Sequence, residues 1–277
     1  MAYRILGSLA DAEDAVQDTF IKWSNIDSDS LDNAQAWLTT VCTRHCLDMH
    51  QRADRTRVDY TGVWLPEPIH HEVTGDASAQ LELASSLTTA FLLMLQRLTP
   101  KERAAYLLYE IFGEPYGDVA RILSVAEPAC RQLVSRAKRH IDKDNVRYVA
   151  GTEQQNIFLE AFKMAVNHGD ITVLSELLAD DISLNTDGGG RVPAILKPLY
   201  GRERVCRFVG RRLSRYWVDL HWSVITINGT LGIVVKDKET NIHACVSFLY
   251  DTTGRVTTIY IMRNPDKLKG VDRVELH

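Results

Sequence analysis

The hydrophobic periodicity of this chain changes near Glu153, and this change predicts its architecture. Before Glu153, apolar residues recur at the three-to-four-residue spacing of amphipathic helices. Two further helical stretches, about 153–167 and 170–178, and a third at about 201–215 lead into alternating segments. Asn228-Gly229 and Thr253-Gly254 are hairpin signals between those segments. We therefore expect helical domains followed by an α+β domain with a curved sheet and helices in its concave face. The alternating segments are Val218–Ile227, Thr230–Lys236, His243–Tyr250 and Arg255–Met262.

Length and composition narrow the class of protein. A chain of 277 residues exceeds the usual size of one domain, so two or three units are expected. Its 45% hydrophobic and 25% charged residues are typical of a soluble globular protein. With no membrane-length apolar run and no signal-peptide pattern, we expect a cytoplasmic protein with no membrane partner. The five scattered cysteines predict reduced thiols rather than a disulfide framework.

Two helices are predicted near the N-terminus. The first, Leu9–Trp23, has Asp11 as a candidate cap and an acidic exposed face. Its expected buried stripe is Ala12, Ala15, Val16, Thr19, Phe20 and Trp23. The polar segment Asn25–Asn33 leads to the second helix, Ala34–Gln51, which is followed by a basic stretch. Residues 58–78 are predicted to be a linker because Gly and Pro interrupt any periodicity. Trp64 within this linker indicates a segment that docks elsewhere.

Helical patterning resumes at about Ala79, with one helix predicted over Leu81–Leu98. Thr99-Pro100-Lys101-Glu102 is a capping-box start for the next helix. A short helix over Pro115–Leu123, a turn at 124–126 and a basic helix over Glu127–Ile141 form a helix-turn-helix pattern. The net charge of the chain is −4, but residues 121–143 carry +4 and residues 1–32 carry −5. The local positive charge favours contact with phosphates.

Several motifs in this order resemble one protein family. AYRILGSLADAEDAVQDTFIKW and AWLTTVCTRHCLDMHQRADRTR resemble region 2 of the bacterial extracytoplasmic-function (ECF) sigma factors, and residues 98–141 resemble their region 4. WLPEP, DGGG at 187–190 and NPDKL at 264–268 resemble the sigma-J type, which has a fused SnoaL-like (NTF2-like) domain. The resemblance implies a multidomain chain: two all-α sigma domains plus an α+β cone. Its parts are region 2 at 1–57, a linker at 58–78, region 4 at 79–143 and the SnoaL-like domain at 150–277. Because the family usually has more sequence before AYRILGS, the first helix of region 2 is expected to be short.

The resemblance implies a sigma factor that binds core RNA polymerase, through its clamp coiled coil and its flap, and promoter DNA. The residues matching the clamp-binding positions are Asp14, Gln17 and Asp18. For the −10 element, cations and an aromatic suit a melted strand: Trp37, Arg44, Arg52, Arg55 and Arg57. For Trp37 a core position is the alternative. For the −35 element in the major groove, the candidates are Arg131, Gln132, Ser135, Arg136, Lys138 and Arg139.

The C-terminal domain is expected to regulate these activities in cis, through contacts among three motifs. These motifs are Trp64, Leu65, Pro66, Glu67 and Pro68; Asp187, Gly188, Gly189 and Gly190; and Asn264, Pro265, Asp266, Lys267 and Leu268. Gly188–Gly190 predict a flexible turn, and Pro265 predicts a fixed bend after the last strand. The run of arginines from Arg202 to Arg215 predicts a basic helix that suits contact with DNA or polymerase, or exposure to solvent.

Two alternative functions remain at the level of sequence. A helix-turn-helix regulator with a ligand-sensing domain would bind duplex DNA without polymerase. A SnoaL-type enzyme would use Asp187, His221 or His243, but no carboxylate-rich cone is evident, so no catalytic residue is expected. Cys42, Cys46 and His50 lie on one helix face, which cannot surround a metal. We therefore expect no metal and no cofactor, and no residue pattern identifies a ligand for the cone.

Overall fold

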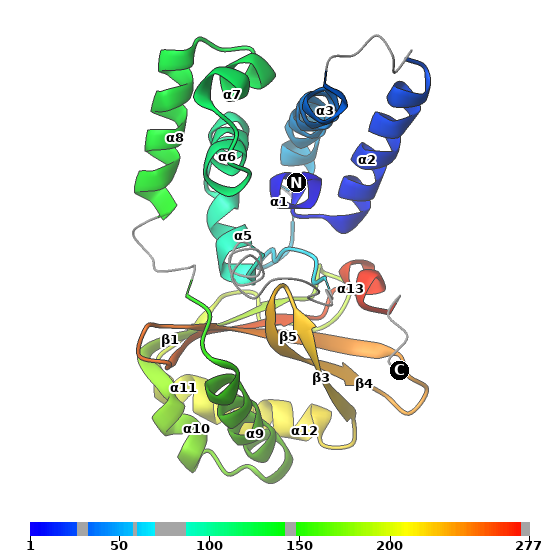
Figure 1. Ribbon diagram of the computed structural model, residues 1–277. Helices are drawn as coiled ribbons and strands as arrows, with labels where there is room; N and C mark the ends of the chain where they lie inside the picture. The colour runs from blue at the N-terminus through cyan, green and yellow to red at the C-terminus, as the bar shows by residue number, and fades with distance from the viewer. Residues whose placement is uncertain (27–32, 58–59, 70–86, 142–147, 273–277) are drawn as a thin grey trace. The chain divides into compact units, whose positions relative to one another are not determined.

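The computed structural model describes residues 1–26, 33–57, 60–69, 87–141 and 148–272, with backbone alone for 51–57 and 272 (Figure 1). The chain forms two compact units. Met1–Asp59 and Leu92–Asp144 make the first unit, and Tyr60–Phe91 and Asn145–His277 make the second. The described part of the predicted linker, residues 60–69, therefore belongs to the unit that contains the sheet. Among the described residues, no helix combines the length and the apolar character needed to cross a membrane.

The first part of the helical unit contains α1 (Ala2–Leu6), α2 (Leu9–Ser24) and α3 (Ala34–Arg57). The cap of α2 is Ser8, whose hydroxyl accepts a hydrogen bond from the amide of Asp11 at 3.2 Å, so the prediction that Asp11 caps this helix was wrong. Ala12, Ala15 and Thr19 are buried as predicted. Val16 and Phe20, expected in the same stripe, are 41% and 58% exposed.

The second part contains α5 (Thr89–Gln96), α6 (Pro100–Tyr106), the π-helical turn η2 (Leu107–Ile111), α7 (Tyr116–Leu123) and α8 (Glu127–Ile141). The capping box is confirmed, because the Thr99 hydroxyl accepts from the amide of Glu102 and the Glu102 carboxylate accepts from the amide of Thr99. Ser124 ends α7 in a left-handed conformation, and Cys130 and Val134 of α8 pack on Val119 and Leu123 of α7. The helix predicted from Leu81 is described from Thr89, and residues 81–86 lie outside the described part of the chain.

The second unit is built on a six-stranded sheet with the order β2-β1-β6-β5-β4-β3. All neighbours are antiparallel except β1 and β6, which run parallel. Asn228 and Gly229, both with positive φ, make the predicted turn between β3 and β4. The strands are β1 (Leu178–Asp187), β2 (Leu199–Tyr200), β3 (His221–Ile227), β4 (Thr230–Lys236), β5 (Ile242–Tyr250) and β6 (Val256–Met262).

Helices cover one face of this sheet (Figure 1): α9 (Thr152–His168), α10 (Thr172–Leu177), α11 (Arg202–Arg207), η3 (Phe208–Leu213) and α12 (Ser214–Trp217). Because side chains alternate along a strand, Ile259 and Ile261 of β6 join the core under these helices. Tyr260 and Met262 face the other way. There they lie beside Leu65 of the segment Tyr60–Ile69, which we call the strap. The helix α13 (Pro265–Asp272) follows β6.

Candidate functional site

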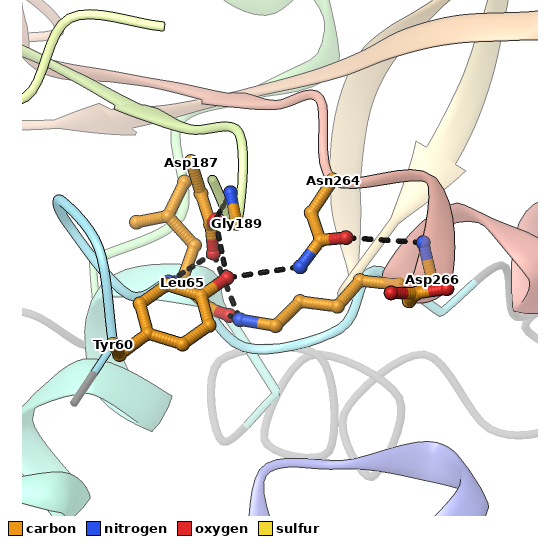
Figure 2. A network of polar contacts seen from close by, with 7 residues as sticks. Tyr60, Leu65, Asp187, Gly189, Asn264 and Asp266 are labelled. Atoms are coloured by element: carbon orange, nitrogen blue, oxygen red, sulfur yellow. Dashed lines mark hydrogen bonds and ion pairs between the residues drawn. The ribbon is translucent and has the colours of Figure 1, made fainter. Parts of the chain in front are cut away.

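The strap is bonded to the carboxylate of Asp187, the last residue of β1 (Figure 2). One oxygen of this carboxylate accepts hydrogen bonds from the Leu65 amide and the Lys267 ammonium, both at 2.8 Å. The other oxygen accepts from the Tyr60 hydroxyl at 2.5 Å and the Gly189 amide at 3.0 Å. The structure therefore joins residues of WLPEP, DGGG and NPDKL, the three motifs that were expected to contact one another. We call this network the latch.

Lys267 bonds the strap in a second way. Its ammonium donates to the carbonyl oxygen of Leu65 at 2.7 Å and lies over the rings of Tyr60 and Trp64, at 4.7 and 4.3 Å from their centroids. The side chain of Asp187 is fully buried and that of Lys267 is 9% exposed. Burial, followed by the hydrogen bond to Asp187, raises the pKa of Tyr60, so Tyr60 is a neutral donor at physiological pH.

The parallel pairing of β1 with β6 brings the two chain segments of the latch together. The backbone oxygen of Asp187 accepts from the amides of Arg263 and Asn264, at 2.7 and 2.9 Å. Asn264 donates to the Tyr60 hydroxyl at 2.9 Å and accepts from the amide of Asp266 at 3.0 Å, which makes it the cap of α13 (Figure 2). Pro265 is the first residue of α13, so the proline that was predicted to fix a bend after the last strand starts a helix.

The glycines of DGGG allow this close approach. Gly189 has φ +60°, and a Cβ placed there would lie 2.2 Å from the side-chain nitrogen of Asn264. A Cβ on Gly188 would lie 2.5 Å from the carbonyl oxygen of Val192. Both positions therefore need a residue without a side chain, and this requirement explains the motif better than flexibility does.

A second anchor of the strap was missed from the sequence. Asn228, predicted only as a turn residue, exchanges two hydrogen bonds with Ile69: the Ile69 amide donates to its side-chain oxygen and its own amide donates to the Ile69 carbonyl, both at 2.9 Å. Its side-chain nitrogen also donates to the Thr89 hydroxyl at 3.1 Å. Nothing in the sequence around Asn228 indicates that this turn residue would bond a segment from a distant part of the chain.

In the helical unit, the acidic face of α2 is exposed at Asp14 and Gln17. Asp18 is paired with His45 of α3 at 3.0 Å and still exposes 54% of its side chain. Ile21, 53% exposed, follows Gln17 and Asp18 by four and three residues and so shares their face. Ile21 was not among the residues predicted to contact polymerase. The face thus presents carboxylates around an aliphatic side chain, which suits a partner with basic and apolar groups.

The residues predicted to contact the −10 element have different surroundings. Trp37 is half-buried and packs on Trp23, with ring centroids 5.5 Å apart. Arg44 donates to the carbonyl oxygens of Ile122 and Arg121, both at 2.8 Å, and to the Ser124 hydroxyl at 3.1 Å. This guanidinium therefore binds the turn of the helix-turn-helix. The side chains of Arg52, Arg55 and Arg57 lie outside the described residues, as does most of the polar segment before α3.

On α8, the six predicted −35 residues fall into two groups. Arg131 is paired with Glu127 at 2.6 Å and lies over the Tyr116 ring, and Lys138 is paired with Glu110 at 2.8 Å. Val134 and Ala137 are buried. The remaining four are exposed and follow the spacing of one helix face: Gln132, Ser135, Arg136 and Arg139.

The candidate catalytic residues are not arranged as an acid–base pair. His243, near the start of β5, lies 2.9 Å from Asp237, which directly follows β4. Hydrogen bonds from Asn241 and His243 hold the pKa of Asp237 at about 2. His221 is exposed at the start of β3, and Asp187 is bonded to the strap. Among the described residues, no group of histidine, cysteine and acidic side chains has an arrangement that would hold a metal.

A helix-turn-helix preceded by an acidic helical face, in a chain with a fused α+β sheet domain, is the architecture of a DNA-binding transcription protein. Comparison with known proteins identifies the family. Residues 1–56 match the family described as Sigma-70 region 2, and residues 88–141 match Sigma-70, region 4. The chain is 32% identical to the ECF RNA polymerase sigma factor SigJ of Mycobacterium tuberculosis, over 98% of this chain and 89% of that protein. It belongs to the ECF RNA polymerase sigma factors.

Two further matches support this assignment. The probable ECF sigma factor SigI of Mycobacterium tuberculosis is 31% identical, over 77% of this chain and 81% of that protein. The crystal structure of Mycobacterium tuberculosis SigJ matches with a TM-score of 0.74 and 30% identity, covering 97% of this chain and 93% of that one. The predicted fold class, two helical sigma domains plus a C-terminal α+β domain, and the predicted family are confirmed.

Proposed function

We propose that this sigma factor is restrained in cis by its own C-terminal domain, which holds the strap through the latch. The observation that carries the proposal is the bonding of Leu65 by both Asp187 and Lys267, in a segment that lies between the two DNA-reading regions. The parts played by the DNA-reading regions and by the polymerase-binding face are also proposals, and they are taken in turn below.

The two DNA-reading regions must separate to act together. Positions −10 and −35 are about 85 Å apart on duplex DNA, because B-DNA rises about 3.4 Å per base pair. In the helical unit, Arg44 of region 2 is bonded to the turn of the helix-turn-helix. A protein in this arrangement does not span both elements. The ten linker residues Tyr60–Ile69 are bonded to the sheet domain at both ends. While they are bonded, up to about 35 Å of extended chain is not available to let the two DNA-reading regions move apart.

For the surfaces that act on partners, we propose three roles. The face of α2 with Asp14, Gln17, Asp18 and Ile21 binds the clamp of core polymerase, and region 4 contacts the flap. Gln132, Ser135, Arg136 and Arg139 read or contact the −35 element, whereas Arg131 and Lys138 are held by Glu127 and Glu110 at the edge of that face. Arg44, with Trp37, acts on the −10 element once its contact with the helix-turn-helix is released. The C-terminal domain acts as a binding module without catalysis.

The test is in vitro transcription with core polymerase reconstituted with the full chain. Promoters are first identified by transcribing genomic fragments with this holoenzyme. Initiation is then compared among the wild type, Lys267→Met, which breaks the latch, and Lys269→Met, which changes an exposed lysine two residues away. We expect Lys267→Met to increase initiation at least threefold and Lys269→Met to leave it unchanged. An unchanged or lower rate for Lys267→Met, with polymerase binding retained, would contradict the restraint.

A further inference from the structure

A cavity of about 540 Å³ lies in the C-terminal domain, between the sheet and its covering helices. Its volume is in the range of sites for small organic molecules. Most of its wall is apolar: Ile195, Leu199, Phe208, Leu213, Trp217 and Ile261. The exposed residues Pro193, Arg212 and Tyr216 also line the cavity, so it is open to solvent on one side and a molecule can enter it. The cavity therefore has the character of a binding site for a largely apolar molecule.

The polar groups of the cavity specify the charge of that molecule. Two arginines, Arg212 and Arg263, line it, and none of its described lining residues is acidic. One terminal guanidinium nitrogen of Arg263 donates a hydrogen bond to the Pro193 carbonyl oxygen at 2.5 Å. The buried Nε of Arg263 has no hydrogen-bond partner among the described residues. A buried guanidinium donor without a partner is costly, and a carboxylate accepts two such donors at once.

The same wall continues directly into the latch. Thr186 and Arg263 line the cavity, and the next residue after each, Asp187 and Asn264, belongs to the latch. The amide of Arg263 also donates to the backbone oxygen of Asp187 at 2.7 Å. A ligand that reorients Arg263 therefore acts on the backbone that positions the carboxylate of Asp187.

We propose that this cavity binds an amphipathic organic acid, with its apolar body against the helices and its carboxylate on Arg263, and that occupancy is coupled to closure of the latch. The coupling rests on the restraint proposed above, whereas the binding site does not. The ligand joins Arg263 to the cavity wall next to Asp187, so it favours the closed latch. By thermodynamic reciprocity, opening the latch lowers the affinity for the ligand by the same factor by which the ligand favours the closed latch.

Binding is tested by calorimetry on the full chain with decanoate, below its micelle concentration, and with decan-1-ol as the uncharged probe. We expect decanoate to bind at least tenfold more tightly than decan-1-ol. Arg263→Met should remove this preference, and Arg215→Met, at an exposed arginine of α12 outside the cavity, should keep it. Ala194→Trp, which fills the cavity, should abolish binding of both probes. Each variant is first shown to be folded by circular dichroism.

Equal binding of the two probes by the wild type, or an unchanged preference in folded Arg263→Met, would overturn the site. Coupling is tested by decanoate affinity in Lys267→Met, with Lys269→Met as the control. We expect at least threefold weaker binding in Lys267→Met, and equal affinity in the two variants would overturn the coupling. Neither measurement contains polymerase or promoter DNA, so failure here is distinguishable from failure of the transcription test.

Discussion

The ammonium of Lys267 lies 2.8 Å from a carboxylate oxygen of Asp187, although 80 residues separate them in the chain, and both side chains are withdrawn from solvent. Removing one partner of a buried ion pair leaves the other charge uncompensated. We expect Lys267→Met to lower the free energy of unfolding by about 3–5 kcal/mol, measured by urea denaturation monitored on the sheet domain. Lys269→Met should change it by less than about 0.5 kcal/mol, because Lys269 is exposed. Equal stability of the two variants would contradict the role of the ion pair.

The raised pKa of Tyr60 predicts how stability depends on alkaline pH. Burial and Asp187 raise this pKa in the folded state, above the value of about 10 for an unfolded chain. The unfolded state therefore loses the phenol proton first, so stability is fully present below about pH 10 and falls above it. Urea unfolding between pH 8 and 11 should show a smaller decline in Tyr60→Phe than in the wild type. Tyr216→Phe, at an exposed tyrosine, should retain the full decline, and an identical decline in all three proteins would contradict the prediction.

The exposed face of α8 predicts which substitutions weaken promoter binding most. Arg136 is exposed on the face shared with Gln132 and Arg139, and an arginine that bonds a base contributes about 1–3 kcal/mol of discrimination. Arg136→Ala should weaken holoenzyme binding to a promoter by about 5- to 150-fold, in a gel-shift titration at fixed salt. Lys138→Ala should have a smaller effect, because Lys138 is already paired with Glu110. A larger effect of Lys138→Ala would place the DNA on the other side of the helix.

The acidic face of α2 predicts charge-dependent binding to core polymerase. Asp14→Lys reverses a charge on this face, and Ile21→Asp buries a carboxylate where an apolar contact is proposed. We expect each to weaken the affinity for core polymerase at least tenfold, measured by fluorescence anisotropy with labelled protein. Glu160→Lys makes the same charge change on an exposed position of α9 and should have no effect. Loss of binding in Glu160→Lys as well would indicate a dependence on total charge rather than on this face.

Local patterns predicted the elements of this fold well. The alternation in the second half of the chain predicted β4 at its observed bounds and β3, β5 and β6 within a few residues, because each of these strands places side chains in the core of the sheet domain. The capping box at Thr99 was correct because it depends on residues three apart.

Predictions that required knowledge of distant neighbours were less complete. Val16 and Phe20 have the spacing of a buried stripe, but spacing does not show whether another element covers them, and they are exposed. The two hydrogen bonds between Asn228 and Ile69 join residues 159 apart in the chain, which no local pattern encodes. A family resemblance predicted that the three latch motifs would contact one another. Their geometry depends on the parallel pairing of β1 with β6, which the sequence did not indicate.

The division of the chain into its two units determines which segments must be kept together when this regulator is transferred to another protein. The strap and its anchors belong to the same unit although about 120 residues separate Leu65 from Asp187 in sequence. A gene fragment that starts at residue 150 would encode a sheet whose Tyr260 and Met262 lack their cover from Leu65. A transplant of this regulation onto another sigma factor therefore has to carry two separate pieces of coding sequence, one of them inside the recipient's own linker.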